Sequence, residues 1–412
     1  MDLELRAITD DERRAFNRAV ATAFGGIPTE DELDEWGDEL AVDRTLAAFD
    51  GDEIVANAGA YTFELTVPGG ARVPTAGVTV VGVRATHRRR GLLTRMMDEQ
   101  LDDVARRGEP LAALTASESS IYGRFGYGQA TSSTWWQLTR EGTTFSSPSR
   151  ASGVVRLVDR EAALASVPAV YDGAARERVG EVTRSEKYWD RVYKERRQPA
   201  SPSGDGHPFF TAVHYDTAGT ADAFARYSVK GDSPHGRAAN VLRVHELHAT
   251  ATEAEAALWA YLLGVDLVGT VRADDRPVDE PLRWRLADPR RVEVTQLTDH
   301  LWVRVVDVAA AMSARTYATD DALVLGLVDP FRPINDGAWT VDGGPDGATC
   351  TRTDRDPDLV LSAPDLGALY LGGVSASTLA HAGRVEERTR GAIARADAFF
   401  GTHPAPWCST HF

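Results

Sequence analysis

The chain has 412 residues, with 45 Lys and Arg against 61 Asp and Glu, which gives a formal net charge of −16. At roughly 100–200 residues per domain, this length predicts two to four domains. The acidic balance argues against general nucleic-acid binding, because that function needs a cationic surface that releases counterions. A hydrophobic fraction of 43% and a charged fraction of 26% are ordinary for a folded protein and exclude wholesale disorder.

Cysteine usage and the N-terminus exclude further classes of protein. Two cysteines, Cys350 and Cys408, cannot form a disulfide framework, and the sequence has no zinc-type spacing. No apolar run approaches the roughly 18 residues of a membrane-spanning helix. The first residues, MDLELRAITDDERR, are acidic where a signal peptide would be basic and then apolar. We therefore expect a cytoplasmic protein of several domains, with neither a metal nor a membrane as partner.

Patterns along the first 145 residues alternate between helices and strands, which predicts an α/β domain. Helical spacing covers residues 10–24 and 30–40, and it returns in residues 91–108, where Gly108 is a stop signal. Residues 121–128 (IYGRFGYG) predict a short helix and turn. Strand-like stretches are residues 44–50, 53–67, 75–83, 110–117 and 130–140.

Two further segments follow a polar, Ser/Pro-rich linker at residues 141–152. The first of them again places a strand, residues 238–249, before a helix, residues 252–264. From about residue 290, short strands with Gly and Asp turns predict an antiparallel sheet and therefore an α+β domain. We place the domains at residues 1–145, 153–288 and 290–402, with an irregular tail at 403–412.

One stretch carries recognisable chemistry, the sequence VVGVRATHRRRGLL from Val80 to Leu93. A strand runs into a short loop with three consecutive arginines and Gly91, and a helix follows at once. The helix N-terminus supplies free N–H groups and partial positive charge, glycine lets the backbone approach closely, and arginine adds charge-assisted hydrogen bonds. The pattern is typical of a pyrophosphate site, although its spacing alone also fits a solvated basic turn.

The loop residues Arg88 to Leu93 (RRRGLL) resemble the acyl-CoA loop of GCN5-related N-acetyltransferases, the GNAT superfamily, which usually ends in Gly or Ala where this chain has Leu93. The longer strings VTVVGVRATHRRRGLLTRMM and SESSIYGRFGYGQAT resemble one subfamily closely, the Eis-type (enhanced intracellular survival) aminoglycoside N-acetyltransferases. The strings LRVHELHA, LWVRVVDVAAAMSARTY and LGALYLGGVSASTLA are similar to the middle and last domains of that subfamily. The resemblance therefore covers the whole chain.

The resemblance implies a fold of the α/β and α+β classes. Two tandem GNAT-like domains come first, and a sterol-carrier-protein-like α+β domain comes last. The residues agree that the second GNAT copy is degenerate, because the loop HELHATATEA after Val244 has no R-x-x-G pattern and therefore no phosphate cradle.

Acetyl-CoA is the cosubstrate that the resemblance implies. Its pantetheine arm and thioester would meet backbone N–H groups of a splayed strand at Val81, Gly82 and Val83. Its pyrophosphate and remaining contacts map to Arg88, Arg89, Arg90, Gly91, Leu92, Leu93, Thr94, Ser117 and Glu118.

The catalytic roles also follow from the resemblance. The general acid maps to Tyr122, with Tyr127 in the same string as the alternative. A phenol with a pKa of about 10 is a competent proton donor to a leaving thiolate. The general base maps to the C-terminal carboxylate, here that of Phe412, which the family folds back into the active site. Trp407 and Phe412 favour an ordered tail, because disordered ends rarely contain such residues.

The resemblance places two aromatic residues, Phe24 and Trp36, in the amine pocket. An aromatic wall beside the acidic residues around Trp36 suits a polycation. His411 stands where close relatives carry a carboxylate, so it changes the charge of the site, and its chemistry also makes it an alternative base.

The resulting hypothesis is an acetyl-CoA-dependent N-acetyltransferase that modifies aminoglycoside-like polyamines at several positions through a ternary complex. The family also implies a homohexamer. Two alternatives stay open, because a fold does not decide function. The chain could acetylate protein lysines or other small amines, or it could be a non-catalytic sensor of acyl-CoA or lipid.

Overall fold

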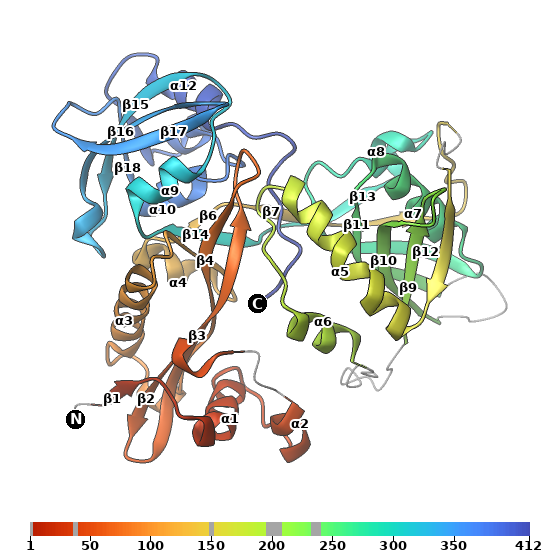
Figure 1. Ribbon diagram of the computed structural model, residues 1–412, viewed down its shortest axis with the longest axis horizontal. Coiled ribbons are helices and arrows are strands. Elements are labelled where there is room, and N and C mark those ends of the chain that lie inside the picture. Colours follow the sequence, from red (N-terminus) through yellow and green to blue (C-terminus); the bar gives the residue numbers. More distant parts are fainter. Residues whose placement is uncertain (1–2, 36–39, 148–151, 195–207, 232–239) are drawn as a thin grey trace. The chain divides into compact units, whose positions relative to one another are not determined.

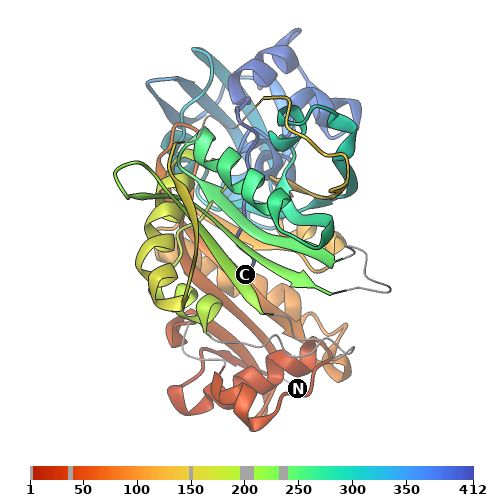
Figure 2. The same ribbon diagram turned by 90° about the vertical axis from the view of Figure 1, so that its right-hand side faces the viewer.

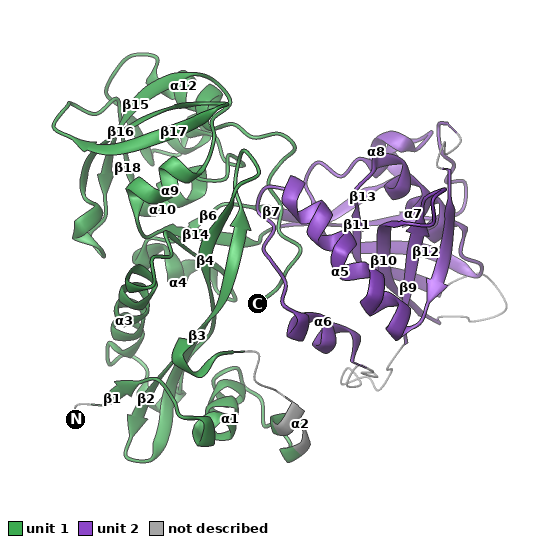
Figure 3. Cartoon of the chain, in the orientation of Figure 1, with its two compact units in different colours: residues 1–131, 299–412 green, residues 132–298 purple. Residues whose placement is uncertain are grey.

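A computed structural model describes residues 3–35, 40–147, 152–194, 208–231 and 240–412. The chain divides into two compact units, residues 1–131 with 299–412 and residues 132–298 (Figure 3). Within the described residues, no helix combines the length and the apolar character needed to cross a membrane.

The first unit contains a mixed sheet with the strand order β1-β2-β3-β4-β5-β14-β6 (Figure 1). Neighbouring strands are antiparallel except β4 and β5, which run parallel. The strands are β1 (Glu4–Arg6), β2 (Thr45–Asp50), β3 (Glu53–Thr66), β4 (Arg72–Val83), β5 (Leu111–Thr115), β6 (Gly128–Gln129) and β14 (Leu301–Val305).

Helices cover both faces of this sheet. Ala47 contacts the buried face of α1 whereas the next residue, Ala48, belongs to the cluster beneath the start of α3, and successive strand residues point to opposite faces. Along α3, Met97, Leu101 and Val104 are buried, each contributing roughly 1.5–3 kcal/mol through burial. The helical segments are η1 (Asp10–Glu12), α1 (Arg13–Ala23), α2 (Glu30–Glu35), η2 (Val42–Arg44), η3 (Ala85–His87), α3 (Leu92–Arg106), α4 (Ser119–Tyr122) and η4 (Gly123–Phe125).

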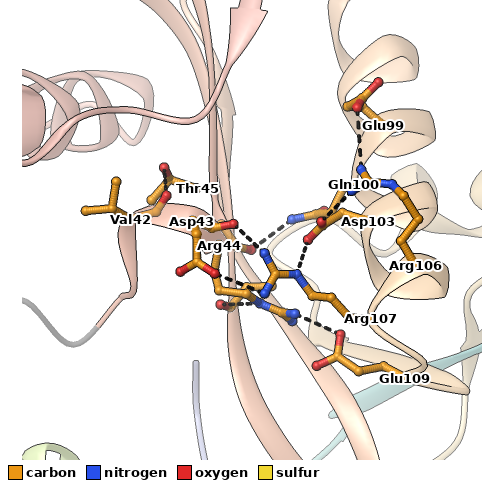
Figure 4. Close-up of polar contacts among 12 residues, drawn as sticks. Val42, Asp43, Arg44, Thr45, Glu99, Gln100, Asp103, Arg106, Arg107 and Glu109 are labelled. Carbon is orange, nitrogen blue, oxygen red and sulfur yellow. Dashed lines mark hydrogen bonds and ion pairs between the residues drawn. The ribbon is translucent and has the colours of Figure 1, made fainter.

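Ion pairs fasten the C-terminal end of α3 to the segment before β2 (Figure 4). Arg107 contacts Asp43 at 3.0 Å and Asp103 at 2.6 Å. Arg44 and Glu109 form a buried pair at 2.9 Å, with side chains only 4% and 6% exposed. Removing one partner of such a pair typically costs about 3–5 kcal/mol, because the other charge is left buried and alone. The orientation of α3 is therefore set at the end away from its N-terminal loop.

The C-terminal part of the first unit forms an α+β layer with the strand order β17-β16-β15-β18-β19. The prediction of a wholly antiparallel sheet is wrong at one place, because β15 and β18 run parallel. The chain leaves edge strand β17 and crosses to the far side of β15, so β18 runs in the same direction as β17 and β15. The elements are α9 (Val308–Ala314), β15 (Asp321–Val328), η6 (Pro333–Asn335), β16 (Gly337–Gly344), β17 (Gly347–Thr353), β18 (Leu359–Ser362), α10 (Ala363–Leu369), α11 (Ala376–His381), β19 (Val385–Glu387) and α12 (Ala392–Phe400).

The second unit has one sheet with the strand order β13-β7-β12-β11-β10-β9-β8. Helices α5 and α7 cover opposite faces of it (Figures 1 and 2), since Phe224 belongs to the cluster under α5 and its neighbours Ala223 and Ala225 belong to the cluster under α7. The elements are β7 (Ser132–Thr139), β8 (Val154–Val158), α5 (Arg160–Glu177), α6 (Glu186–Tyr193), β9 (Phe209–Tyr215), β10 (Ala221–Lys230), β11 (Asn240–Ala249), α7 (Thr252–Gly264), β12 (Val268–Pro277), α8 (Leu282–Arg285), η5 (Pro289–Arg291) and β13 (Glu293–Asp299).

Two strands pair outside the domain in which the sequence places them. β7 lies within the expected first domain but pairs with β12 of the second sheet. β14 lies at the start of the expected third domain but is inserted between β5 and β6 of the first sheet. Sequence patterns divide the chain into contiguous segments, whereas strand pairing joins segments that are distant in the sequence. The limits 1–145, 153–288 and 290–402 stay a prediction about which segments fold alone.

Candidate active site

Strand β4 carries an irregularity at the point where the site begins. Asn57 lies opposite Gly82 while Gly59 lies opposite Thr79, so β4 has one residue more than β3 across this step. Val80 has a φ of 48°, and the side-chain amide of Asn57 donates to its carbonyl oxygen. Bulges of this kind bend a strand and are frequent at functional sites.

The parallel pairing of β4 with β5 ends early. The last paired residues are Gly77 and Ala113, although β4 continues to Val83. In the described part of the chain, the backbone edge of β4 beyond Gly77 is therefore not used by β5. The expected contacts at Val81, Gly82 and Val83 lie on this open edge, and all three residues are half-buried. A strand edge of this kind can bind the amide groups of a pantetheine arm as an extra strand.

The loop between β4 and α3 brings the predicted phosphate ligands together. Arg89 and Gly91 have left-handed backbones, with φ of 64° and 78°. The side chains of Arg88 and Arg90 each donate to a loop carbonyl, Arg88 to Val83 at 3.4 Å and Arg90 to Thr86 at 3.2 Å. Space above Gly91 is open, since a Cβ there would meet no atom within 4 Å.

The first turn of α3 completes this cradle. The first N–H group bonded within the helix is that of Arg95, which donates to the carbonyl of Gly91 at 3.1 Å. Among the described residues, the preceding N–H groups of Leu92, Leu93 and Thr94 have no partner within the helix, as is general for a helix N-terminus. Leu92 can contribute only its backbone, because its side chain is buried. The donor set fits a pyrophosphate.

A histidine that sequence reasoning did not select fixes the start of the loop. Nε2 of His87 lies 3.2 Å from the carboxylate of Asp50, and Nδ1 lies 2.9 Å from the hydroxyl of Thr86. Arg84 forms an ion pair with Glu53 beside it. The signal for His87 was its position directly before the arginines.

The next residues follow β5. Ser117 and Glu118 are exposed, and Glu118 is the N-cap residue of α4, which ends at Tyr122. Burial, followed by the charge of Glu118, raises the pKa of Tyr122, so this phenol stays protonated at neutral pH. The ring of Tyr127 contacts that of Tyr122 edge to face, with centroids 6.0 Å apart.

The two tyrosines differ in access. Tyr127 is completely buried, and burial raises its pKa strongly. Tyr122 is half-buried and therefore reaches the surface of the unit. A proton donor must touch the leaving sulfur, so the geometry favours Tyr122 over Tyr127.

Glycines in the string IYGRFGYG allow the C-terminal layer to approach the tyrosine turn. A Cβ on Gly128 would lie 1.7 Å from the carbonyl oxygen of Pro364 in α10. A Cβ on Gly367 of the same helix would lie 2.2 Å from the carbonyl oxygen of Val303 in β14. Only glycine fits at such close backbone contacts.

The tail ends beside β5. The hydroxyl of Thr115, the last residue of β5, donates to a main-chain oxygen of Phe412 at 2.9 Å. The rings of Phe63 and Phe412 meet edge to face with centroids 4.9 Å apart. Trp407 and Cys408 are buried, so the tail is anchored before it reaches the site. Sequence reasoning missed both Thr115 and Phe63, because neither belongs to a motif.

Of the predicted substrate residues, His411 is exposed and its ring centroid lies 4.5 Å from that of His300. Phe24 is 58% exposed at the end of α1. The preceding Ala23 lies against Gly82, where a Cβ would be only 2.5 Å from its side chain. Phe24 therefore follows a residue that packs directly against Gly82 of β4. Trp36 lies outside the described residues.

Comparison with known protein families agrees with this organisation. Residues 4–130 and residues 180–305 each match the acetyltransferase (GNAT) domain family, and residues 308–409 match the sterol carrier protein domain family.

Full-length relatives extend the match. An uncharacterized N-acetyltransferase from Streptomyces avermitilis is 40% identical over 414 residues, covering 99% of each chain. The N-acetyltransferase Eis of Mycobacterium tuberculosis is 33% identical over 411 residues, covering 98% of each chain. The crystal structure of Eis1 from Mycobacterium abscessus superimposes with a TM-score of 0.87 at 35% identity, over 99% of this chain and 100% of that one.

Proposed function

Since the chain belongs to the Eis family of GNAT N-acetyltransferases, we propose that it transfers acetyl groups from acetyl-CoA to the amines of aminoglycoside-like polyamines. The observation that carries this proposal is the arrangement around β4 and β5. The arginine cradle and the open edge of β4 come from the end of β4 and the start of α3. Tyr122 comes shortly after β5 in the chain, and the main-chain oxygen of Phe412 contacts Thr115, the last residue of β5.

Acetyl transfer needs a neutral amine, a polarised thioester carbonyl and a protonated leaving thiolate. The amine nitrogen attacks the carbonyl carbon, the C–S bond breaks, and Tyr122 gives its proton to the sulfur. The amine proton passes to the carboxylate of Phe412, which Thr115 holds in place. Backbone N–H groups at Val81, Gly82 and Val83 hold the pantetheine arm and thioester during these steps. His411 contributes to the charge around the amine.

Direct transfer in a ternary complex is supported by the state of the cysteines. Burial raises the pKa of Cys350 to about 12, and Cys408 is buried in the tail. Neither thiol is poised as a thiolate nucleophile. The exposed ring of Phe24 would accept a cationic amine in several orientations, which supports acetylation at several positions. The homohexamer and the cytoplasmic location remain predictions, which sedimentation and cell fractionation can test.

The test is release of CoA thiol with aminoglycosides, short diamines and a lysine peptide. The proposal expects turnover with aminoglycosides and, by mass spectrometry, more than one acetyl group on each aminoglycoside molecule. Initial-rate kinetics should be sequential, because both substrates must be bound before CoA is released. Turnover confined to the peptide would move the substrate to protein lysines. CoA binding without turnover on any amine would support the sensor alternative. Tyr122→Phe is expected to lower kcat by about 100-fold while CoA affinity stays within twofold.

A further inference from the structure

A buried ion pair lies under the tyrosine turn. Arg304 of β14 contacts the carboxylate of Asp329 at 2.6 Å, and both side chains are only 1% exposed. Asp329 also accepts from the side-chain amide of Asn335 at 3.0 Å and from the backbone N–H of Arg332 at 3.1 Å. A buried pair is often no more stabilising than apolar residues of similar volume. A gain in fold stability is therefore not a sufficient reason for a charged pair, rather than apolar residues, at this place.

The guanidinium of Arg304 fills the space directly beneath Gly126. Gly126 has a φ of 88°, and a Cβ there would lie 2.5 Å from the guanidinium carbon. The turn is closed above it by two backbone hydrogen bonds, from Gly126 to Gly123 at 3.0 Å and from Tyr127 to Tyr122 at 3.3 Å. Arg304 and the hydrogen bonds together define the path of the backbone that follows Tyr122.

The positive charge of Arg304 also acts on Tyr127, the residue after Gly126. It lowers the pKa of Tyr127, against the larger opposite effect of burial. Among the described residues, the Tyr127 hydroxyl and Nε of Arg304 are both buried and make no hydrogen bond. The Tyr127 ring in turn contacts the Tyr122 ring. Asp329, Arg304 and Tyr127 thus interact in sequence, and the Tyr127 ring packs against Tyr122 from the interior of the unit.

We propose that Arg304 is a positioning residue for acetyl transfer, whose buried guanidinium sets the place of the Tyr122 hydroxyl through Gly126 and Tyr127. The inference rests on the proposed function for the role of Tyr122. It assigns to the C-terminal half of the chain a part in catalysis by the first GNAT domain. A displacement of about 1 Å at a reacting group can cost about 100-fold in rate, so small changes under the turn should be visible in turnover.

The test uses Arg304→Met with Asp329→Asn, which removes the guanidinium, keeps the shape of the side chain at position 329 and leaves neither partner of the pair as an unpaired buried charge. We expect kcat to fall 10- to 100-fold while KM for acetyl-CoA stays within about threefold, because the cradle is untouched. Arg304→Lys is expected to recover less than half of the lost turnover, since an ammonium cannot fill the planar space under Gly126. The matched control is another buried pair among the described residues of this unit, changed as Arg44→Met with Glu109→Gln, with kcat expected within threefold.

A second readout does not depend on turnover. In protein labelled at the tyrosine ring carbon Cζ, the NMR signal of Tyr122 is identified by its loss in Tyr122→Phe. We expect this signal to move in the Arg304 and Asp329 double variant and to stay in the Arg44 and Glu109 control. An unmoved signal with unchanged kcat would overturn the proposal.

Two further outcomes separate this inference from the proposed function. If Tyr122→Phe retains full turnover, the assigned acid is wrong, while movement of the Tyr122 signal still supports the positioning by Arg304. Tyr127→Phe keeps the ring that contacts Tyr122 and removes only the hydroxyl, so it is expected to lower kcat far less than Tyr122→Phe does. A loss as large as that of Tyr122→Phe would make Tyr127 the donor and overturn the positioning role.

Discussion

The two GNAT-like sheets share a bulge but differ in the segments that come after it. In the first sheet the register shifts between Asn57 and Gly59 across from β4, and in the second it shifts between Arg226 and Tyr227 across from β11. In both, a helix and a parallel strand come next, α3 and β5 in one and α7 and β12 in the other. The bulge is therefore a property of the fold, and it does not by itself make a cofactor site.

The two sheets differ first in how far their parallel strand pairs extend, β4 with β5 in the first and β11 with β12 in the second. In the first sheet the pairing stops at Gly77, before the bulge, which leaves the edge of β4 open. In the second sheet it continues to Val244, directly before His245 at the bulge, and beyond the bulge the side chain of Arg276 in β12 donates to the carbonyl of Leu247 in β11 at 2.9 Å. An open edge is needed for a pantetheine arm to bind as an extra strand.

The helix N-termini differ as well. Residues 84–91 separate β4 from α3 and carry the arginines, whereas only Thr250 and Ala251 separate β11 from α7. The first turn of α7 holds Glu253 and Glu255, which place negative charge at the position that corresponds to the proposed phosphate site of the first unit. The proposed cofactor site thus rests first on the arginine loop, which the second copy lacks among its described residues.

The largest expected effect comes from removing the cradle that distinguishes the first sheet. Replacing Arg88, Arg89 and Arg90 by Ala should lower CoA affinity by more than about 100-fold, because each charge-assisted contact contributes roughly 1.5–3 kcal/mol. Isothermal titration of CoA measures this. The control removes two exposed arginines of the second unit, Arg283 and Arg290, and should change affinity less than twofold. Equal losses would mean that general surface charge binds the cofactor.

A smaller effect is expected from the contact between β5 and the tail. Thr115→Val removes the hydroxyl that holds Phe412 and should lower kcat about 10-fold, the range expected for a misplaced catalytic group, with CoA affinity unchanged. Thr115→Ser keeps the hydroxyl and should retain most of the turnover. Adding residues after Phe412 should lower kcat further. Full activity of the extended chain would remove the terminal carboxylate from the mechanism.

The smallest effect is expected at Glu255 in the first turn of α7, where the stability of the second unit should depend on pH. Burial, and then the charge of Glu280, raises the pKa of Glu255 from 4.5 to about 7. Folding therefore favours the protonated form, and this contribution to stability is full below about pH 4.5 and is lost as the pH rises through 7. Glu255→Gln should stabilise the second unit by about 2 kcal/mol at pH 8 and change little at pH 5.

Thermal unfolding of the natural protein and of Glu255→Gln between pH 5 and pH 8 measures this difference in stability. Arg276 and Arg285 also face Glu255 and partly offset the shift. Glu253→Gln changes an exposed carboxylate of the same helix and serves as the control, with no pH-dependent difference expected. A Glu255→Gln variant that is less stable than the natural protein at pH 8 would show that Glu255 is held as a carboxylate.

Sequence patterns predicted the parts of the site that are contiguous. The arginine loop, Gly91 and the start of α3 lie in one string, so their types favour a phosphate cradle without knowledge of the fold, although their spacing alone also fits a solvated basic turn. The family resemblance added Tyr122, and the structure supplies the physical reason, since Tyr122 reaches the surface and Tyr127 does not.

Contacts between distant segments could not be predicted in this way. Thr115 and Phe412 are 297 positions apart, and nothing around Thr115 marks it as a partner of the tail. β14 enters the first sheet from beyond residue 300, and its apolar alternation fits any sheet. Arg304 reads as a surface charge in a strand, although it is buried under the turn that carries Tyr122.

The central claim is that only the first of the two GNAT-like sheets binds CoA. Isothermal titration of the full chain with CoA, at equal protein concentration in the natural form and in the Arg88, Arg89 and Arg90 triple variant, tests it most directly. We predict one CoA per chain in the natural protein and no measurable binding in the variant under the same conditions. Two CoA molecules per chain, or one that persists in the triple variant, would contradict the claim.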